Sequence, residues 1–153
     1  MEELTRLIRE DMRPALGVTE PGAIAFAVSK ARTYVKGAVT GVELRLNSGM
    51  YKNAYTCGIP NNSFMGNEYA AALGLLAGKP EMGLECLAEV TEADNAAAEE
   101  LVAAGKIKVS MSGISSRIFI EAKVTSENGE AVVTIRGSHT NIVRIQVNGE
   151  TVF

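Results

Sequence analysis

The sequence predicts an α+β fold in which a helical layer packs on a mainly antiparallel sheet. Apolar residues recur at helical spacing through the first two thirds of the chain, and they alternate beyond Gly105. An Asn128-Gly129 pair between two alternating segments predicts a hairpin. An α/β fold with some parallel pairing is the alternative. We expect a single domain over 1–153, since this length can bury a core of its own.

The helices are predicted from apolar spacing and from the residues at their ends. They are expected over 4–12, 19–35, 69–76, 81–90 and 91–104. In the second, Thr19 is expected to act as N-cap, with Glu20 and Pro21 in the first turn. Small residues crowd this helix, so another element can approach its backbone closely. Thr91 and Asp94 resemble a capping box that opens the alanine-rich fifth helix.

The strands are predicted from alternation and from the turns between them. They are expected over 38–46, 54–59, 107–111, 118–124, 131–135 and 143–147, the last four forming a meander. Asn148-Gly149 predicts one more turn, four residues before Phe153. We interpret so short a return strand as a sign that the natural chain continues or that another chain completes the sheet.

Composition disfavours several classes of function. The formal net charge is −3 and no run of lysine or arginine exceeds two residues, so nucleic-acid and anionic-lipid binding are not expected. The N-terminus does not resemble a leader, and no segment approaches the roughly 18 apolar residues that span a bilayer. We therefore expect a cytoplasmic protein. Cys57 and Cys86 show no CxxC spacing, which argues against a disulfide or a self-contained metal site.

Two polar segments are candidates for a binding site. His139 is the only histidine and lies in a polar corner between two strands, where it could bind a carboxylate or move a proton. A structural hydrogen-bonding role is the more common alternative. The polar residues at 51–53 and 58–63 could position a ligand or form an ordinary solvated connection. Cys57 is interpreted as a small hydrophobe in a strand, and Cys86 as one on a helix.

Several motifs resemble those of a known family when taken in order. They are Pro14-Ala-Leu-Gly-Val-Thr-Glu-Pro21, Met50-Tyr-Lys-Asn53, Ala70-Ala-Ala-Leu-Gly74, Gly83-Leu-Glu85, Ala103-Ala-Gly-Lys106, His139-Thr-Asn-Ile-Val143 and Asn148-Gly149. On these residues the chain resembles the L-cysteine desulfidase group, relatives of the iron–sulfur L-serine dehydratase alpha chain. The resemblance implies β-elimination of a small amino acid to pyruvate and ammonia, with a [4Fe-4S] cluster as Lewis acid.

The chain departs from that family at three places. Val18 stands where the family motif PALGCTEP has its cysteine, and a valine side chain cannot act as a base. Pro60-Asn-Asn-Ser63 replaces the family's PGTG loop. The part of the family proteins that binds the cluster has no counterpart here. We therefore expect no catalytic residue, no metal ligand and no cofactor in this chain.

These observations predict the N-terminal domain or subunit of an iron–sulfur lyase-like protein of amino-acid metabolism, inactive alone. The predicted substrate-binding residues are Thr19, Glu20, Lys52, Asn53, Ser138, His139, Thr140 and Asn141. Expected partners are a small amino acid, a C-terminal domain or partner subunit carrying the cluster, and a second copy of the chain, but neither nucleic acid nor membrane. The alternatives are a noncatalytic amino-acid-binding or protein-interaction module, and an independent enzyme that uses His139.

Overall fold

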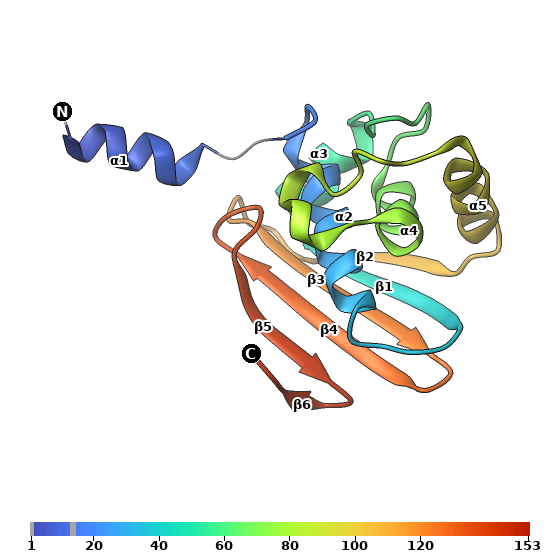
Figure 1. Ribbon diagram of the computed structural model, residues 1–153. Helices are drawn as coiled ribbons and strands as arrows, with labels where there is room; N and C mark the ends of the chain where they lie inside the picture. Colours follow the sequence, from blue (N-terminus) through green and yellow to red (C-terminus); the bar gives the residue numbers. More distant parts are fainter. Residues whose placement is uncertain (1, 13–14) are drawn as a thin grey trace.

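The computed structural model describes residues 2–12 and 15–153. Its helices are α1 (Glu2–Asp11), α2 (Thr19–Arg32), α3 (Ser48–Thr56), α4 (Asn67–Ala77), the 3-10 helix η1 (Pro80–Glu85) and α5 (Glu92–Ala103). Its strands are β1 (Val39–Asn47), β2 (Ile107–Gly113), β3 (Phe119–Ser126), β4 (Gly129–Arg136), β5 (Ile142–Val147) and β6 (Glu150–Thr151). A helical layer covers one face of the sheet (Figure 1). The predicted α+β class is confirmed.

The sheet has the order β2-β1-β3-β4-β5-β6. From β3 onward each strand pairs antiparallel with the next, so the predicted meander is confirmed for β3, β4 and β5. It is wrong for β2, which lies beside β1 and not beside β3. β1 pairs antiparallel with β3 but parallel with β2. A parallel pair needs a crossover rather than a tight turn, and the segment that contains α3, α4, η1 and α5 provides it. One parallel pair therefore brings these helices onto the sheet.

The two faces of the sheet have different chemistry. Along β3, buried Ile120, Ala122 and Val124 alternate with partly exposed residues. On the outer face the Arg45 guanidinium lies 2.9 Å from Glu121, and Lys123 lies 2.8 Å from Glu130. These cross-strand ion pairs leave the outer face polar and solvated, whereas the inner face builds the core with α2 and α4.

Helix α2 is the centre of the helical layer, and α4 packs directly against its backbone. A Cβ on Gly74 would lie 2.5 Å from the carbonyl oxygen of Ala25, and a Cβ on Gly78 would lie 2.6 Å from the Ser29 Cβ. Because the higher-numbered residue of α2 faces the higher-numbered residue of the α4 segment, the two helices run in the same direction. Their N-terminal ends, at Thr19 and Asn67, therefore lie at the same end of the layer.

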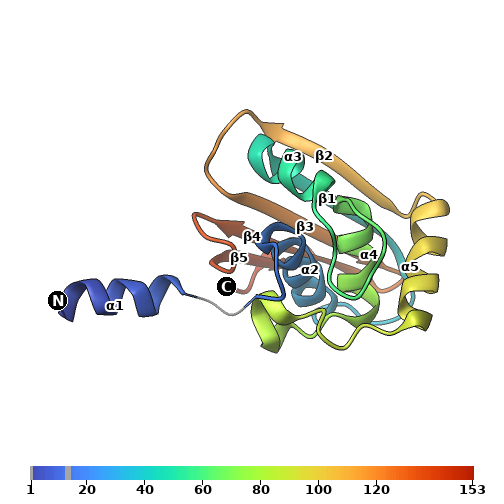
Figure 2. The same cartoon turned by 90° about the horizontal axis from the view of Figure 1, so that it is seen from above.

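Helix α1 is found where the spacing predicts it, but it is not part of the helical layer that we expected it to join. Figures 1 and 2 show it standing apart from the body of the molecule. Leu4, Ile8 and Met12 are exposed. The inner face of β3 and β4 is already covered by α2, so this short helix finds no sheet face to fill. Pro14 of the PALGVTEP motif lies outside the described residues.

Three local predictions are wrong. In the expected strand over 54–59, residues 54–56 are the last turn of the helix α3, whose buried residues Met50 and Ala54 lie one turn apart, and only Gly58 makes an isolated bridge. The expected helix over 81–90 is the shorter η1, since Gly83 has a φ of +57° that interrupts it. The N-cap of α2 is Val18, which places Thr19 inside the first turn.

Other local predictions are confirmed. Thr91 and Asp94 form the capping box of α5: the Thr91 hydroxyl accepts from the Asp94 amide, and the Asp94 carboxylate accepts from the Thr91 amide. Asn148 and Gly149 have φ values of 49° and 84° and join β5 to β6.

Every helix in residues 2–12 and 15–153 is too short or too polar to span a lipid bilayer.

Gly74→Ala tests the contact between α2 and α4. The added methyl would collide with the Ala25 backbone, so we expect a loss of about 1–3 kcal/mol in the free energy of unfolding, although alanine favours helices. Urea unfolding measures the loss. Gly58→Ala is the matched control, because nothing lies within 4 Å of the position that its methyl group would occupy and its φ is not positive. Equal stability of Gly74→Ala and wild type would show that the helices are not in close contact.

Thr91→Ala tests the capping box and should cost about 1 kcal/mol of unfolding free energy. Hydrogen bonds from Thr91 hold the pKa of Asp94 below its usual value. A lowered folded-state pKa stabilises the protein above the unfolded-state pKa, and this contribution is lost as pH falls through the folded-state pKa. The stability difference between wild type and Asp94→Asn should therefore shrink on acidification. Urea unfolding from neutral to acidic pH measures it, and a constant difference would contradict the assignment.

Candidate functional site

Four predicted site residues meet in one hydrogen-bonded group at the start of α2. We name Thr19, Glu20, Asn53 and His139 the α2 N-terminal cluster. The Thr19 hydroxyl lies 3.3 Å from His139 Nε2 and donates to Glu20 Oε2 at 3.3 Å. Asn53 Nδ2 donates to Glu20 Oε1, also at 3.3 Å. Residues 120 positions apart in sequence thus form a continuous polar line.

The Thr19 hydroxyl links the Glu20 carboxylate to the His139 ring. It donates its single proton to Glu20, and its oxygen lies within hydrogen-bond distance of His139 Nε2. The cluster therefore presents an imidazole and a carboxylate, both partly buried.

The loop between β4 and β5 is held in shape by its own hydrogen bonds, and this positions His139. The Arg136 amide donates to the Asn141 carbonyl at 3.1 Å, and Asn141 Nδ2 donates back to the Arg136 carbonyl at 2.9 Å. Gly137 turns the chain with a φ of +81° and donates its amide to the Ile118 carbonyl. The predicted residue Asn141 thus supports the loop rather than the cluster.

Val18 leaves the first turn of α2 without a side-chain cap. It adopts an extended conformation with φ −69° and ψ 133°, it is 43% exposed, and its side chain has no atom that could accept from an amide. The hydroxyl of Thr19 is directed to His139 and Glu20 instead. The N-terminus of α4, after Gly66, also lacks a side-chain cap. Both helix ends carry partial positive charge.

The remaining predicted residues are not part of this cluster. Lys52 and Ser138 are exposed, and neither side chain makes a hydrogen bond or ion pair within the described part of the chain. Thr140 follows His139 and lines a neighbouring pocket of about 410 Å³ together with Phe26 and the whole of η1. The structure thus brings four of the eight predicted residues together and places Thr140 beside them.

Sequence reasoning missed the acidic character of that pocket. Glu81 and Glu85 of η1 line it, and no lysine, arginine or histidine does among the residues that the structure describes. In the expected helix over 81–90, these two carboxylates would lie on a face exposed to solvent. No signal in the sequence alone brings η1 next to residue 140, because the contact depends on how α2 packs: a Cβ on Gly22 would lie 2.9 Å from the Leu84 carbonyl oxygen.

The N-terminal end of α4 contains an unpaired polar atom. Asn67 is fully buried, and its Nδ2 donates to the Tyr51 carbonyl at 3.2 Å. Its Oδ1 has no hydrogen-bond partner among the described residues. A buried acceptor without a donor costs about 1–3 kcal/mol, so a water or another donor at this position would stabilise the fold.

The two cysteines are free and lie in different environments. Cys57 follows α3 rather than lying in a strand, and partial burial together with the negative charge of Glu20 raises its pKa. Cys86 is buried with its Sγ 3.7 Å from the Gly22 carbonyl, and burial raises its pKa to about 12. No three His, Cys, Asp or Glu side chains gather as a metal site in residues 2–12 and 15–153.

Comparison with known proteins shows similarity to proteins named UPF0597. The chain is 33% identical over 150 residues to a UPF0597 protein of Clostridium botulinum (strain Hall), 38% identical over 152 residues to one of Shewanella sp. (strain ANA-3), and 34% identical to one of C. botulinum (strain Okra). These matches include 98–99% of the chain but only 35–36% of each relative. No protein-family model matches the chain.

These comparisons correct the expected family and function. The relatives matched along almost the whole chain are named UPF0597 proteins, and none of these names describes an L-cysteine desulfidase or an L-serine dehydratase. The lyase-like function, the iron–sulfur terms and the assignment as part of an iron–sulfur lyase therefore have no support and are withdrawn. The motifs used for that resemblance remain structural landmarks, since they include Thr19, Glu20 and His139.

Glu20→Gln tests the electrostatic effect of Glu20 on Cys57, which adds to the larger effect of burial. Removing the negative charge should lower the Cys57 pKa, because a nearby carboxylate disfavours the thiolate. Alkylation by iodoacetamide at mildly alkaline pH should then be faster at Cys57, while Cys86 stays unmodified. Peptide mass spectrometry over a range of pH follows both residues. Glu68→Gln removes the first-turn carboxylate of α4 and is the control. Equal acceleration of alkylation by both variants would contradict an effect specific to Glu20.

Proposed function

We propose that the α2 N-terminal cluster and the adjoining pocket bind a small zwitterionic ligand of the amino-acid type. The observation that carries the proposal is the polar line from His139 through Thr19 and Glu20 to Asn53. Thr140, the residue after His139, lines a pocket of about 410 Å³. The proposal concerns binding and assigns no reaction to the chain.

The positive group of such a ligand would have carboxylate partners in the cluster and in the pocket. Glu20 contributes one carboxylate from the cluster, and Glu81 and Glu85 contribute two from the pocket. An ammonium group is a compact donor that can satisfy several carboxylate oxygens at once. The described residues that line the pocket include two glutamates and no basic side chain, which favours a ligand with an amino group there.

The negative group has donors at the helix end. The first-turn amides of α2 lack a side-chain cap, and a helix N-terminus favours a carboxylate through these amides and its dipole. Asn53 Nδ2 is a further donor from α3. A zwitterion would therefore find carboxylates for its ammonium group and amide donors for its carboxylate.

Isothermal titration calorimetry with a set of matched ligands tests the proposal. L-serine should bind saturably, whereas N-acetyl-L-serine, which lacks the ammonium group, and L-serinamide, which lacks the carboxylate, should bind at least about tenfold more weakly, equivalent to about 1.4 kcal/mol. Other small amino acids tested in parallel define the side-chain preference.

Matched variants locate the binding site in that experiment. Glu20→Gln and His139→Ala should raise the dissociation constant about tenfold or more. Glu68→Gln changes the equivalent carboxylate of α4 and should leave it unchanged. Undetectable binding of every amino acid, or equal binding of L-serine and its two blocked derivatives, would overturn the proposal.

A further inference from the structure

A second hollow lies at the end of the sheet, and the proposed function makes no use of it. It is a groove of about 470 Å³ between the connection from β2 to β3 and the connection from β4 to β5. We name it the arginine groove after its two basic side chains. Its main lining residues are Asn47, Ile114, Arg117, Phe119, Arg136 and Val143.

One wall of the arginine groove is held by hydrogen bonds from the end of β1. Asn47 is buried; its Nδ2 donates to the Ser115 carbonyl at 2.7 Å, and its Oδ1 accepts from the Phe119 amide at 3.0 Å. The Ser115 amide donates to the Ser48 hydroxyl at 3.0 Å. Both ends of the connection are therefore fixed to β1 and α3, so the wall exists before any ligand arrives.

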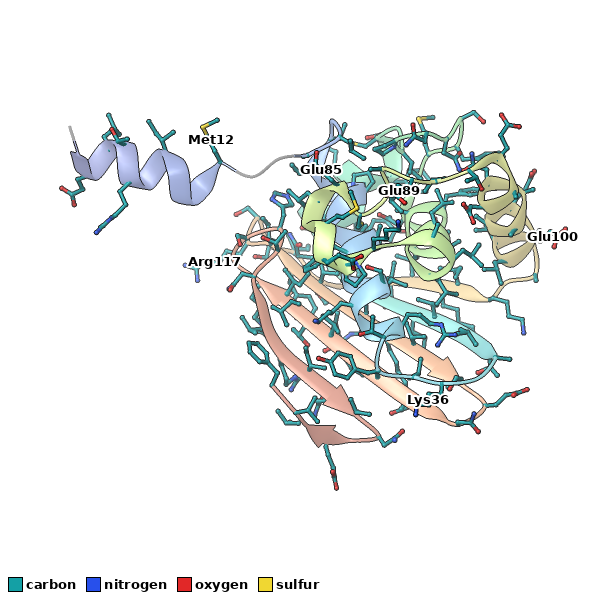
Figure 3. The ribbon with its side chains drawn as sticks, in the orientation of Figure 1. Met12, Lys36, Glu85, Glu89, Glu100 and Arg117 are labelled. Atoms are coloured by element: carbon teal, nitrogen blue, oxygen red, sulfur yellow. The ribbon has the colours of Figure 1, made fainter. Side chains whose placement is uncertain are left out.

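The two guanidinium groups of the groove have no acidic partner. Neither Arg117 nor Arg136 makes an ion pair within the described part of the chain, and no acidic residue lines the groove. Arg45 and Arg144, on the same sheet, both pair with Glu121. Arg136 lies 5.1 Å from the centre of the Phe119 ring, which orients its planar group. Figure 3 shows Arg117 at the edge of the molecule, at the end of the sheet.

The groove also carries an apolar surface. Ile114 is 92% exposed and Val143 is 44% exposed, and the partly buried Phe119 ring lies between the two strand connections. An exposed isoleucine costs free energy that burial against an apolar group would recover. The groove thus combines two unpaired cations with an apolar surface and has no compensating negative charge.

We propose that the arginine groove binds a small phosphate monoester with an apolar body. The dianionic phosphate would accept hydrogen bonds from both guanidinium groups, for which the planar fork of arginine is well suited. The apolar body would cover Ile114 and Val143. This site is separate from the α2 N-terminal cluster, since no residue of that cluster lines it.

Calorimetric titration with phenyl phosphate tests this proposal on the full chain. Phenyl phosphate should bind saturably and at least about fivefold more tightly than inorganic phosphate, because the ring adds apolar contact. Arg117→Ala should raise its dissociation constant at least about tenfold. Arg136→Lys keeps the positive charge but removes the planar guanidinium group, and it should weaken binding several-fold. Its circular dichroism spectrum and its urea unfolding should match those of wild type.

Lys36→Ala is the matched control, because it removes one cation at a distance from Arg117 (Figure 3). It should leave the affinity for phenyl phosphate unchanged. Absence of saturable binding to wild type, or an equal loss of affinity in Lys36→Ala and Arg117→Ala, would overturn the proposal. Equal affinity for inorganic phosphate and phenyl phosphate would overturn its apolar half. These results are independent of the amino-acid titrations, so failure of one proposal is distinguishable from failure of the other.

Discussion

The close contact between the backbones of α2 and α4 is the constraint on which the rest of the structure depends. It requires small residues on both helices: Gly74 and Gly78 on one side, Ala25 and Ser29 on the other. Side chains of ordinary size would separate the helices and lift one of them from the sheet. With these residues, α2 buries ten of its 14 residues against α4, η1 and the inner face of β3 and β4.

A helix buried on so many sides fixes its first turn in space, and the α2 N-terminal cluster is a consequence of this. Thr19 and Glu20 cannot move far while the next residues are packed on every side. The loop that carries His139 is tied to the sheet through Arg136, Gly137 and Asn141. Two rigid parts of the chain therefore meet at one hydrogen bond between Thr19 and His139, and α3 adds Asn53. Such preorganisation is what a small-ligand site needs.

The sequence predicts elements well where local chemistry decides them. Alternation identifies strands β2, β3, β4 and β5. The capping box of Thr91 and Asp94 starts α5 at the position that these residues predict. Prediction fails where tertiary packing decides. The residues 54–59 contain β-favouring types, yet the burial of Met50 and Ala54 on one side makes residues 54–56 helical. For Thr19, a competing partner, His139, removes its hydroxyl from the capping role.

The same distinction applies to the functional residues. Residue type and polar context identify Thr19, Glu20, Asn53 and His139 as candidates, but not their mutual contacts. Adjacent residues of one helix can differ in their contacts. The Asn53 side chain donates to Glu20, whereas the Lys52 side chain is exposed, because successive residues of a helix point about 100° apart. Arg117 and Arg136 belong to different strand connections, and only the sheet order brings them to one groove.

Amide hydrogen exchange tests the central claim, the close packing of α2 against α4, most directly. If the two helices form one unit, the amides of Ala23–Val28 and Ala70–Gly74 should exchange only through global unfolding, with the same opening free energy as urea denaturation gives. The exposed helix α1 should exchange orders of magnitude faster. Rapid exchange in α4 while α2 remains protected would contradict the account, because the site at the end of both helices would then lack its common support.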